Sequence, residues 1–186
     1  MANILFLTLA SMEDIFQRGI YTDLIRAIAD KGHNVYVVAP RQRRSGLPTA
    51  VSIYGNIHVL KVMTGNITKV GLVEKGLATL RIESNYENAI RDHFNDVKFD
   101  MIMYSTPPIT FERIVRHLKK KHNAKTYLVL KDIFPQNAVD IGLMRKKGLM
   151  WKYFRRRERT LYQLSDVIGC MSPANMNYVL KHNPDI

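Results

Sequence analysis

A lysine and an aspartate stand side by side after a short apolar run, in the stretch Lys131-Asp132-Ile133-Phe134-Pro135-Gln136. The preceding run, Tyr127 to Leu130, is typical of a buried strand, and an ordinary loop seldom needs a charged pair there. The aspartate carboxylate can accept a hydrogen bond from a sugar hydroxyl or act as a base, and the lysine can pair with it or with a phosphate. The alternative is a self-satisfied structural pair that caps the next turn.

A second candidate is the turn Arg18-Gly19, which lies between an apolar run and a helical pattern. The loop from Ala10 to Gly19 lacks both G-x-G-x-x-G and G-x-x-x-x-G-K-[ST], which argues against a dehydrogenase or an NTPase. Arg18 can still place a cation, and Gly19 a closely approaching backbone, beside a phosphate at the start of the following helix. A surface arginine beside a turn glycine is the alternative.

The most distinctive segment, Arg145 to Arg159, contains eight basic residues, one acidic residue and the only tryptophan of the chain. On a helix, Leu149 and Arg156 share one face while Trp151 and Phe154 share another. A basic and aromatic helix is typical of an anionic lipid interface, which predicts a membrane-facing set. Its members are Trp151, Lys152, Arg155, Arg156 and Arg157. The alternative is an aromatic stripe on the core with a solvated basic back, and one helix can do both.

The charge balance predicts an anionic partner. The formal net charge is +12 and the isoelectric point is about 9.9. Nucleic acid, anionic lipid and phosphorylated ligands all fit this charge. The chain has no RNA-recognition, KH or zinc-finger signature, and its basic residues concentrate in one helix-and-turn element, so nucleic acid is not the expected partner.

Several other kinds of site are not expected. The six histidines fall at no metal-ligand spacing, the single Cys170 can form no internal disulfide, and no G-x-S-x-G elbow is present. Cys170 lies in an apolar run, where a small buried hydrophobe is favoured over a reactive thiol. The N-terminal apolar run is too short for a signal peptide or a membrane span, and together with the single cysteine it predicts a cytoplasmic protein.

Alternating patterns supply the elements that would position these residues. Apolar runs predict strands at 3–9, 33–39, 57–63, 99–104, 127–130 and 167–171, with Pro40 closing the second. Helical spacing predicts helices at about 20–30, 72–94, 109–122 and 151–164, and a last helix opened by Ser172-Pro173. Gly32 is a helix stop, and residues 41–55 are predicted to form a basic loop of turn formers. The helix at 72–94 should pack on the core through Val73, Leu77, Leu80, Tyr86, Ile90 and Phe94.

This alternation predicts an α/β fold of one domain, residues 1–186, with a Rossmann-like doubly wound parallel sheet. The first strand, helix and second strand should form a right-handed crossover unit. In such sheets ligands bind beyond the carboxyl ends of the strands. The loops that follow the predicted strands are therefore the expected ligand-binding loops.

Four stretches occur in order along the chain. They are the opening strand with Arg18-Gly19, the helix ending Lys31-Gly32-His33 before Val35-Tyr36-Val37-Val38, Tyr104-Ser105-Thr106-Pro107-Pro108, and Lys131 to Gln136 with Ala138 to Gly142. Together they resemble the N-terminal half of glycosyltransferase family 4, a GT-B group, in its branch that builds capsule, O-antigen and other bacterial surface polysaccharides. The most specific part is Asp132-Ile133-Phe134-Pro135, which is similar to the family's D-L-W-P-E. Gln136 in place of glutamate, and Arg18-Gly19 in place of a glycine pair, depart from the family pattern.

The resemblance implies a retaining transferase of the hexosyltransferase type with a nucleotide-sugar donor. The donor would be held mainly by a C-terminal domain absent from this chain, so the fragment alone would be inactive, and no cofactor is implied for this domain. The resemblance places an acceptor at Ser105, Thr106, Lys131 and Asp132, with Asp132 as the candidate catalytic residue. Arg18 and Gly19 would face the donor phosphates.

The resemblance also implies a location and partners. A polyprenyl-linked or other glycan acceptor, together with the basic aromatic helix, implies a peripheral protein on the inner face of the cell membrane. A non-catalytic membrane-recruiting or scaffold subunit of the same fold, working with a separate catalytic chain, is the alternative. Whether the native gene continues past Ile186 separates the two alternatives.

Overall fold

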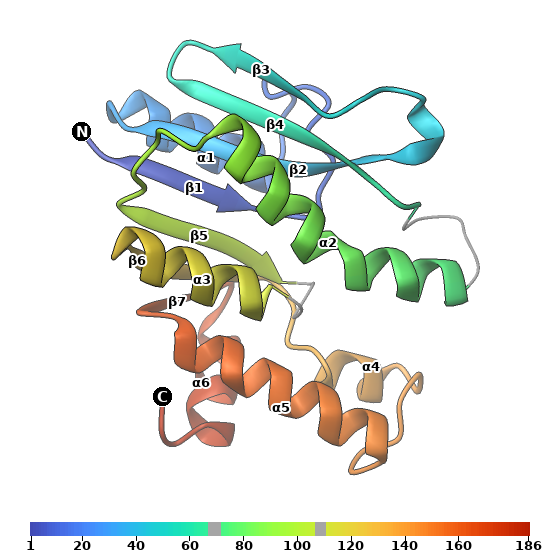
Figure 1. Cartoon of the computed structure of the whole chain (residues 1–186). Coiled ribbons are helices and arrows are strands. Elements are labelled where there is room, and N and C mark those ends of the chain that lie inside the picture. Colours follow the sequence, from blue (N-terminus) through green and yellow to red (C-terminus); the bar gives the residue numbers. More distant parts are fainter. Residues whose placement is uncertain (67–71, 107–110) are drawn as a thin grey trace.

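The computed structural model describes residues 1–66, 72–106 and 111–186, and the side chains of all of these except 72–80. Its strands are β1 (Asn3–Leu7), β2 (Asn34–Gln42), β3 (Ala50–Tyr54), β4 (Ile57–Thr64), β5 (Met101–Thr106), β6 (Lys125–Leu130) and β7 (Val167–Cys170). Within these ranges they form a seven-stranded sheet in the order β3-β4-β2-β1-β5-β6-β7 (Figure 1). Every neighbouring pair is parallel except β3 and β4, which confirms the predicted Rossmann-like α/β fold.

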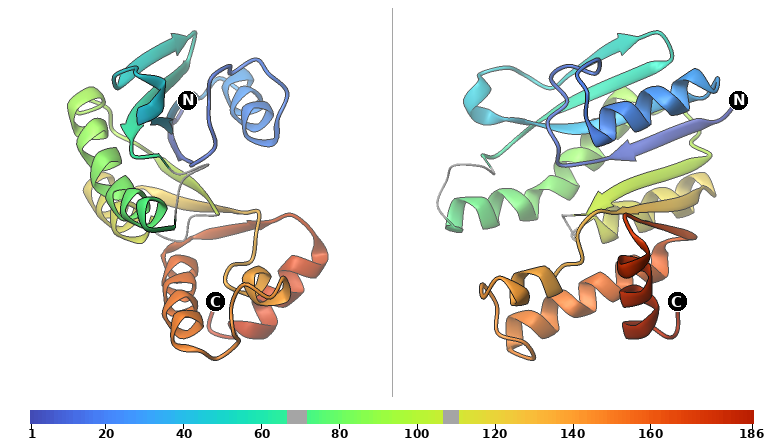
Figure 2. Two further views of the ribbon diagram at one scale, coloured as in Figure 1. Left: turned by 90° about the vertical axis from the view of Figure 1, so that its right-hand side faces the viewer. Right: turned by 180° about the vertical axis from the view of Figure 1, so that it is seen from behind.

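Helices cover both faces of this sheet, as doubly wound topology requires. They are α1 (Ile20–Asp30), α2 (Leu72–His93), α3 (Glu112–His122), α4 (Gln136–Asp140), α5 (Leu149–Leu164) and α6 (Pro173–His182), with a 3-10 turn, η1, at Arg43–Ser45. Seen end-on in Figure 2, α2 and α3 lie on one face of the sheet and α1 on the other.

The core is correspondingly divided into two apolar layers. Leu5 and Leu7 of β1 pack with the layer under α2, α3 and α5, while Ile4 and Phe6 pack with the layer under α1. This alternation follows from the two-residue period of a strand. Of the stripe predicted on the second helix, Tyr86, Ile90 and Phe94 are buried as expected, whereas Val73, Leu77 and Leu80 fall outside the described side chains.

The predicted loop at 41–55 is wrong in its second half, because Ala50–Tyr54 forms β3. This strand pairs antiparallel with β4 through a tight turn at Gly55, whose φ of 60° lies in the region that favours glycine. β3 is short, and Ile53 points away from the core, so it carries little of the buried apolar pattern from which strands are recognised. Its pairing with β4 decides its conformation.

The second strand does not end at Pro40 as predicted, since β2 continues to Gln42 beside β4. Thr8 N–H donates to Val38 O at 3.1 Å on the β1 side, and successive residues of a strand alternate sides. The nitrogen of Pro40 therefore faces the β1 side beyond the end of that strand. A missing N–H costs no ladder hydrogen bond there.

Two predicted helix boundaries are confirmed. Gly32 follows α1 with a φ of 82°, as a helix stop requires. Ser172 caps α6, because its Oγ accepts a hydrogen bond from Asn175 N–H at 3.2 Å. The short helix α4, directly after Pro135, was not predicted.

Candidate functional site at the carboxyl edge

The carboxyl ends of β1, β5 and β6 lie next to one another, and we call this side of the sheet the carboxyl edge. The register pairs Leu7 with Tyr104 and Thr106 with Leu130, so the loops after these three strands leave the sheet side by side. In Figure 1 the arrowheads of β1 and β5 point toward this edge, and α4 and the start of α5 lie on the same side of the molecule. Ligand sites of open α/β sheets form at such an edge.

Buried hydroxyl groups fasten the end of β5 to the segments that follow β6 and β1. Thr106 Oγ1 donates to the backbone oxygen of Asp132 at 3.3 Å, and Ser105 Oγ donates to Thr8 Oγ1 at 3.2 Å. Ser105 and Thr106 are each only 1% exposed. Their contact with an acceptor therefore remains a prediction. In this structure the Thr106 hydroxyl holds the loop that carries Asp132, and the Ser105 hydroxyl ties β5 to Thr8 after β1.

Lys131 and Asp132 extend from this fastened edge. Lys131 is exposed and Asp132 is half-buried. Within the described ranges, neither side chain forms an ion pair or hydrogen bond with the other or with a neighbour. The described residues thus do not form the self-satisfied pair that was the alternative interpretation. Below them the Phe134 ring packs edge-on against Phe154 of α5, with ring centroids 5.0 Å apart, which anchors the loop.

The β1–α1 loop borders a cavity of about 320 Å³, which is lined by Ala10–Asp14 and Gln17–Thr22. Arg18 and Gly19 lie exposed on its wall. A Cβ added at Gly19 would lie 3.1 Å from Thr22 Oγ1, so a side chain at this position would require Thr22 to shift by a few tenths of an ångström. No side chain caps the first turn of α1 in the described structure. Its amide groups are therefore available to an anion.

Lys61 supports the same loop and was missed by the sequence analysis. Its side chain is 9% exposed, and Nζ donates to the backbone oxygen of Glu13 at 3.1 Å and lies 3.4 Å from the Glu13 carboxylate. Lys61 lies within β4, and its partner Glu13 comes from the β1–α1 loop, which folds back over this strand. A charged residue at an inward position of a strand was the available signal.

The two sides of α5 differ in their environment, and they divide the predicted membrane-facing set. Lys152 and Arg156 are exposed. Arg155 turns inward, where it donates to Glu158 Oε2 and Asn183 Oδ1, both at 2.6 Å, and to His182 O at 2.8 Å. These bonds tie α5 to the end of α6.

Arg157 and Trp151 are the two remaining members of the predicted membrane-facing set. Arg157 Nη1 donates to Glu112 Oε2 of α3 at 3.0 Å, and its guanidinium lies 5.9 Å from the centroid of the Tyr153 ring. Trp151 is half-buried, and its indole N–H is shielded with no hydrogen-bond partner among the described residues. Of the five predicted positions, Arg155 and Arg157 are therefore committed to contacts within the domain, so facing a membrane does not fit their geometry.

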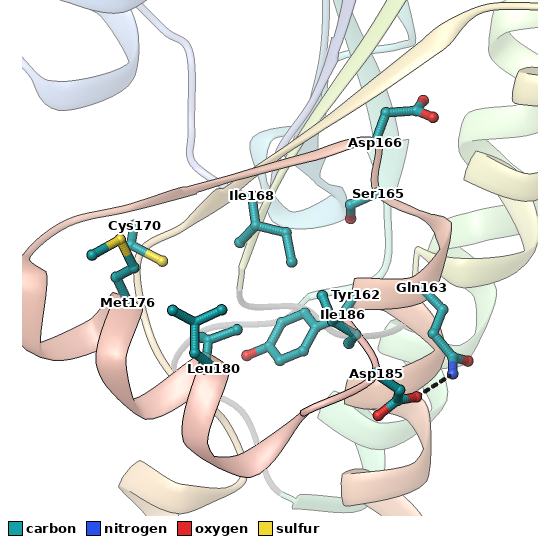
Figure 3. Close-up of a pocket in the computed structure, with 11 residues that line it drawn as sticks. Tyr162, Gln163, Ser165, Asp166, Ile168, Cys170, Met176, Leu180, Asp185 and Ile186 are labelled. Carbon is teal, nitrogen blue, oxygen red and sulfur yellow. Dashed lines mark hydrogen bonds between the residues drawn. The ribbon is translucent and has the colours of Figure 1, made fainter.

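A further cavity, of about 390 Å³, lies between β7, α5 and α6 (Figure 3). Ile168, Cys170 and Leu180 contribute apolar walls, and burial raises the pKa of the Cys170 thiol. This favours the small hydrophobe over the reactive nucleophile. The carboxylates at its rim are already paired, Asp166 with Lys119 at 3.0 Å and Asp185 with Arg159 and Gln163, which leaves little to recognise a polar ligand.

Among the described residues, no group of three or more His, Cys, Asp or Glu side chains could hold a metal ion. No helix in the described ranges combines the length and apolar character needed to cross a bilayer.

The fold is shared with known sugar transferases. No protein-family model and no curated protein sequence matches the chain. Among solved structures, the Escherichia coli trehalose-6-phosphate protein bound with UDP-2-fluoro glucose superposes with a TM-score of 0.62 at 11% identity, over 95% of this chain and 42% of that one. Arabidopsis thaliana UGT89C1 complexed with UDP superposes with a TM-score of 0.60 at 12% identity, over 99% of this chain and 49% of that one.

A third structure agrees with these two. The UDP-forming alpha,alpha-trehalose-phosphate synthase from Burkholderia vietnamiensis superposes with a TM-score of 0.58 at 10% identity, over 98% of this chain and 43% of that one. All three are GT-B glycosyltransferases, and the chain spans less than half the length of each. The chain therefore has the fold of one half of a GT-B glycosyltransferase.

Proposed function

We propose that this chain is the N-terminal, acceptor-binding domain of a retaining glycosyltransferase of family 4, working in the assembly of a bacterial surface polysaccharide such as capsule or O-antigen. The observation that carries the proposal is the pairing of this fold with a carboxyl edge where Asp132 stands unpaired within the described structure. A hexosyl group would pass from a nucleotide-sugar donor to an acceptor at this edge.

Each candidate residue takes a role that suits its environment. The Asp132 carboxylate accepts hydrogen bonds from acceptor hydroxyl groups or takes up the proton of the attacking hydroxyl. Lys131 is exposed beside it and binds a phosphate of the acceptor. Ser105 and Thr106 support this site through the hydrogen bonds that fasten β5 to its neighbours.

The donor side would lie across the β1–α1 loop. Arg18 and the uncapped first turn of α1 provide positive charge and amide donors for the donor diphosphate. Gly19 lets the phosphate approach the backbone. A second, C-terminal domain would supply the remaining contacts to the nucleotide sugar, since the matched transferases are more than twice as long as this chain. The isolated chain would then bind the donor weakly.

A polyprenyl-linked acceptor is the acceptor class that best suits the charge of the chain. The acceptor would place the domain on the inner face of the cytoplasmic membrane, with exposed Lys152 and Arg156 of α5 toward the anionic headgroups. Each basic residue near such a surface contributes about 1 kcal/mol to binding. The net charge of +12 supports attraction to that surface.

Acceptor binding can be tested with a water-soluble, short-prenyl pyrophosphate-linked sugar and with UDP-glucose as the donor probe. We expect nuclear magnetic resonance titration to shift amide signals at the carboxyl edge with the first probe, and only weakly with UDP-glucose. Asp132→Asn should weaken the first probe about tenfold, because a hydrogen bond to a charged group is worth roughly 1.5–3 kcal/mol.

The matched control is Asp96→Asn, an exposed aspartate in the segment that leads into the amino end of β5. This variant should bind like the wild type. Equal affinity of the two variants for the acceptor probe would place the acceptor site elsewhere and sink the proposed role of Asp132.

A further inference from the structure

Five large apolar side chains stand in water where α4 leads into α5, and we call them the apolar tip. They are Ile141, Leu143, Leu149, Met150 and Tyr153, with 69%, 79%, 87%, 64% and 53% of their surface exposed. Single exposed apolar residues are ordinary on a protein surface, whereas a contiguous group marks an interaction site. Their concentration within residues 141–153 calls for a partner.

The backbone holds this tip in one shape. After α4 the chain reverses at Gly142, whose φ is 75°, and the N–H groups of Leu143 and Met144 both donate to Ala138 O, at 2.9 and 3.1 Å. A second turn is closed by Gly148 N–H donating to Arg145 O at 3.1 Å, directly before α5 begins. The outward side chains are thus presented by hydrogen-bonded turns.

The first turns of α5 sort their residues by face. Leu149 and Tyr153 lie one turn apart on the exposed side, together with Lys152 and Arg156. Phe154 lies on the opposite side and packs on Phe134. The solvent-exposed side of the helix therefore carries both apolar and basic residues.

Exposed basic residues lie in the same segment as the apolar tip. Arg145, Lys146, Lys147, Lys152 and Arg156 are all exposed, and residues 141–157 include no acidic residue. Anionic headgroups over an acyl layer match both the basic residues and the apolar tip.

We propose that the apolar tip inserts into the acyl boundary of an anionic bilayer while the exposed basic residues of the same segment contact the headgroups. The proposal rests on the proposed function, to which it adds the residues and the mode of attachment. The predicted membrane contacts of half-buried Trp151 and of inward-facing Arg155 and Arg157 are thereby reassigned to exposed side chains. Because the tip lies on the same side as the carboxyl edge (Figures 1 and 2), insertion brings Asp132 toward the membrane surface.

Co-sedimentation with phosphatidylcholine vesicles, with and without phosphatidylglycerol, tests the proposal. The variant Leu143→Ser, Leu149→Ser, Met150→Ser should lose at least about tenfold in partitioning for each leucine replaced, since each buries its side chain on insertion. The variant Lys146→Gln, Lys147→Gln, Lys152→Gln should lose about fivefold per charge, and only on vesicles that contain phosphatidylglycerol. The matched control, Ile53→Ser, removes an apolar side chain that is 63% exposed on β3, at the opposite end of the strand order from β7, and should bind like the wild type.

A depth probe separates insertion from adsorption. In a Cys170→Ala background, an environment-sensitive fluorophore on Leu149→Cys should shift to the blue on anionic vesicles, and the same fluorophore on Ile53→Cys should not. Unchanged binding of the serine variant, or no shift at position 149, would overturn the proposal. Wild-type chain that binds no vesicle would overturn it too and make a protein the partner.

Binding of the acceptor probe can be measured in the same variants. The serine variant should bind the soluble prenyl-pyrophosphate sugar as the wild type does, because the tip lies outside the carboxyl edge. Loss of insertion and loss of acceptor binding are thus measured separately.

Discussion

Arg155 and Arg156 are consecutive residues of one helix, and they have opposite environments. The Arg155 side chain is 20% exposed and bonds Glu158, Asn183 and the backbone at the end of α6. Arg156 points into water. One step along an α-helix turns the side chain by about 100°, so a run of arginines cannot all serve one surface. The inward face of α5 holds the domain together, and the outward face is left for a partner.

The largest expected effect is on the inward face. Arg155→Ala leaves the Glu158 carboxylate buried without its cation, which should lower the free energy of unfolding by about 3 kcal/mol. Burial raises the pKa of Glu158, and Arg155 opposes that rise. The loss should therefore be larger at pH 7 than at pH 4, where the carboxyl group holds a proton. Urea unfolding at both pH values measures it, and a loss below 1 kcal/mol at pH 7 would contradict the structural role.

A smaller effect is expected where the inward face meets the candidate site. Phe154→Ala removes the ring that packs against Phe134, and should cost about 2 kcal/mol of stability. Since Phe134 is in the loop that carries Asp132, binding of the acceptor probe should weaken as well. Phe154→Leu, which refills most of the space, should restore both, and calorimetry with the probe checks this. Lower stability with unchanged probe binding would mean that the packing of Phe154 on Phe134 does not position Asp132 for acceptor binding.

The carboxylate that follows α5 offers a test of opposite pH dependence. Burial disfavours the charge of Asp166, but hydrogen bonds from Lys119 and Thr126 prevail and lower its pKa to about 2. The stability it contributes should be complete above its unfolded pKa of 3.8 and be lost as the pH falls toward 2. Asp166→Asn should thus be less stable than the wild type by about 1 kcal/mol at pH 7, allowing for partial exposure.

Thermal unfolding from pH 7 down to pH 2 follows this contribution. The difference between Asp166→Asn and the wild type should close as the pH approaches 2. A constant difference across that range would mean that the charge of Asp166 does not stabilise the fold.

The smallest effect on stability belongs to the outward face. Arg156→Ala should change the free energy of unfolding by less than about 0.5 kcal/mol, because its side chain is exposed. It should nonetheless weaken binding to anionic vesicles about fivefold. Paired with Arg155→Ala, it is the direct measure of the contrast between the two faces. Similar stability losses in both variants would remove that contrast.

Elements with a continuous apolar run or a clear stop signal could be predicted from the sequence, and elements with neither could not. The strands at 57–63 and 127–130 and the helix stop at Gly32 were recovered because each carries its own local signal. β3 and α4 are short and partly exposed, so no periodicity separated them from loops. Lys61 was passed over for a related reason, since its partner Glu13 is distant in the sequence.

Sequence by itself determined the alternating α/β plan, the strand end that Asp132 follows, the turn with Arg18 before α1, and the strongly basic segment before β7. Each of these depends on residue type and short-range spacing. Tertiary structure alone decided that Ser105 and Thr106 point into the sheet, that Arg155 and Arg157 bind other helices, and that an apolar tip stands in water. The physical reason is that exposure and pairing depend on what packs against a side chain, and those neighbours come from distant parts of the chain.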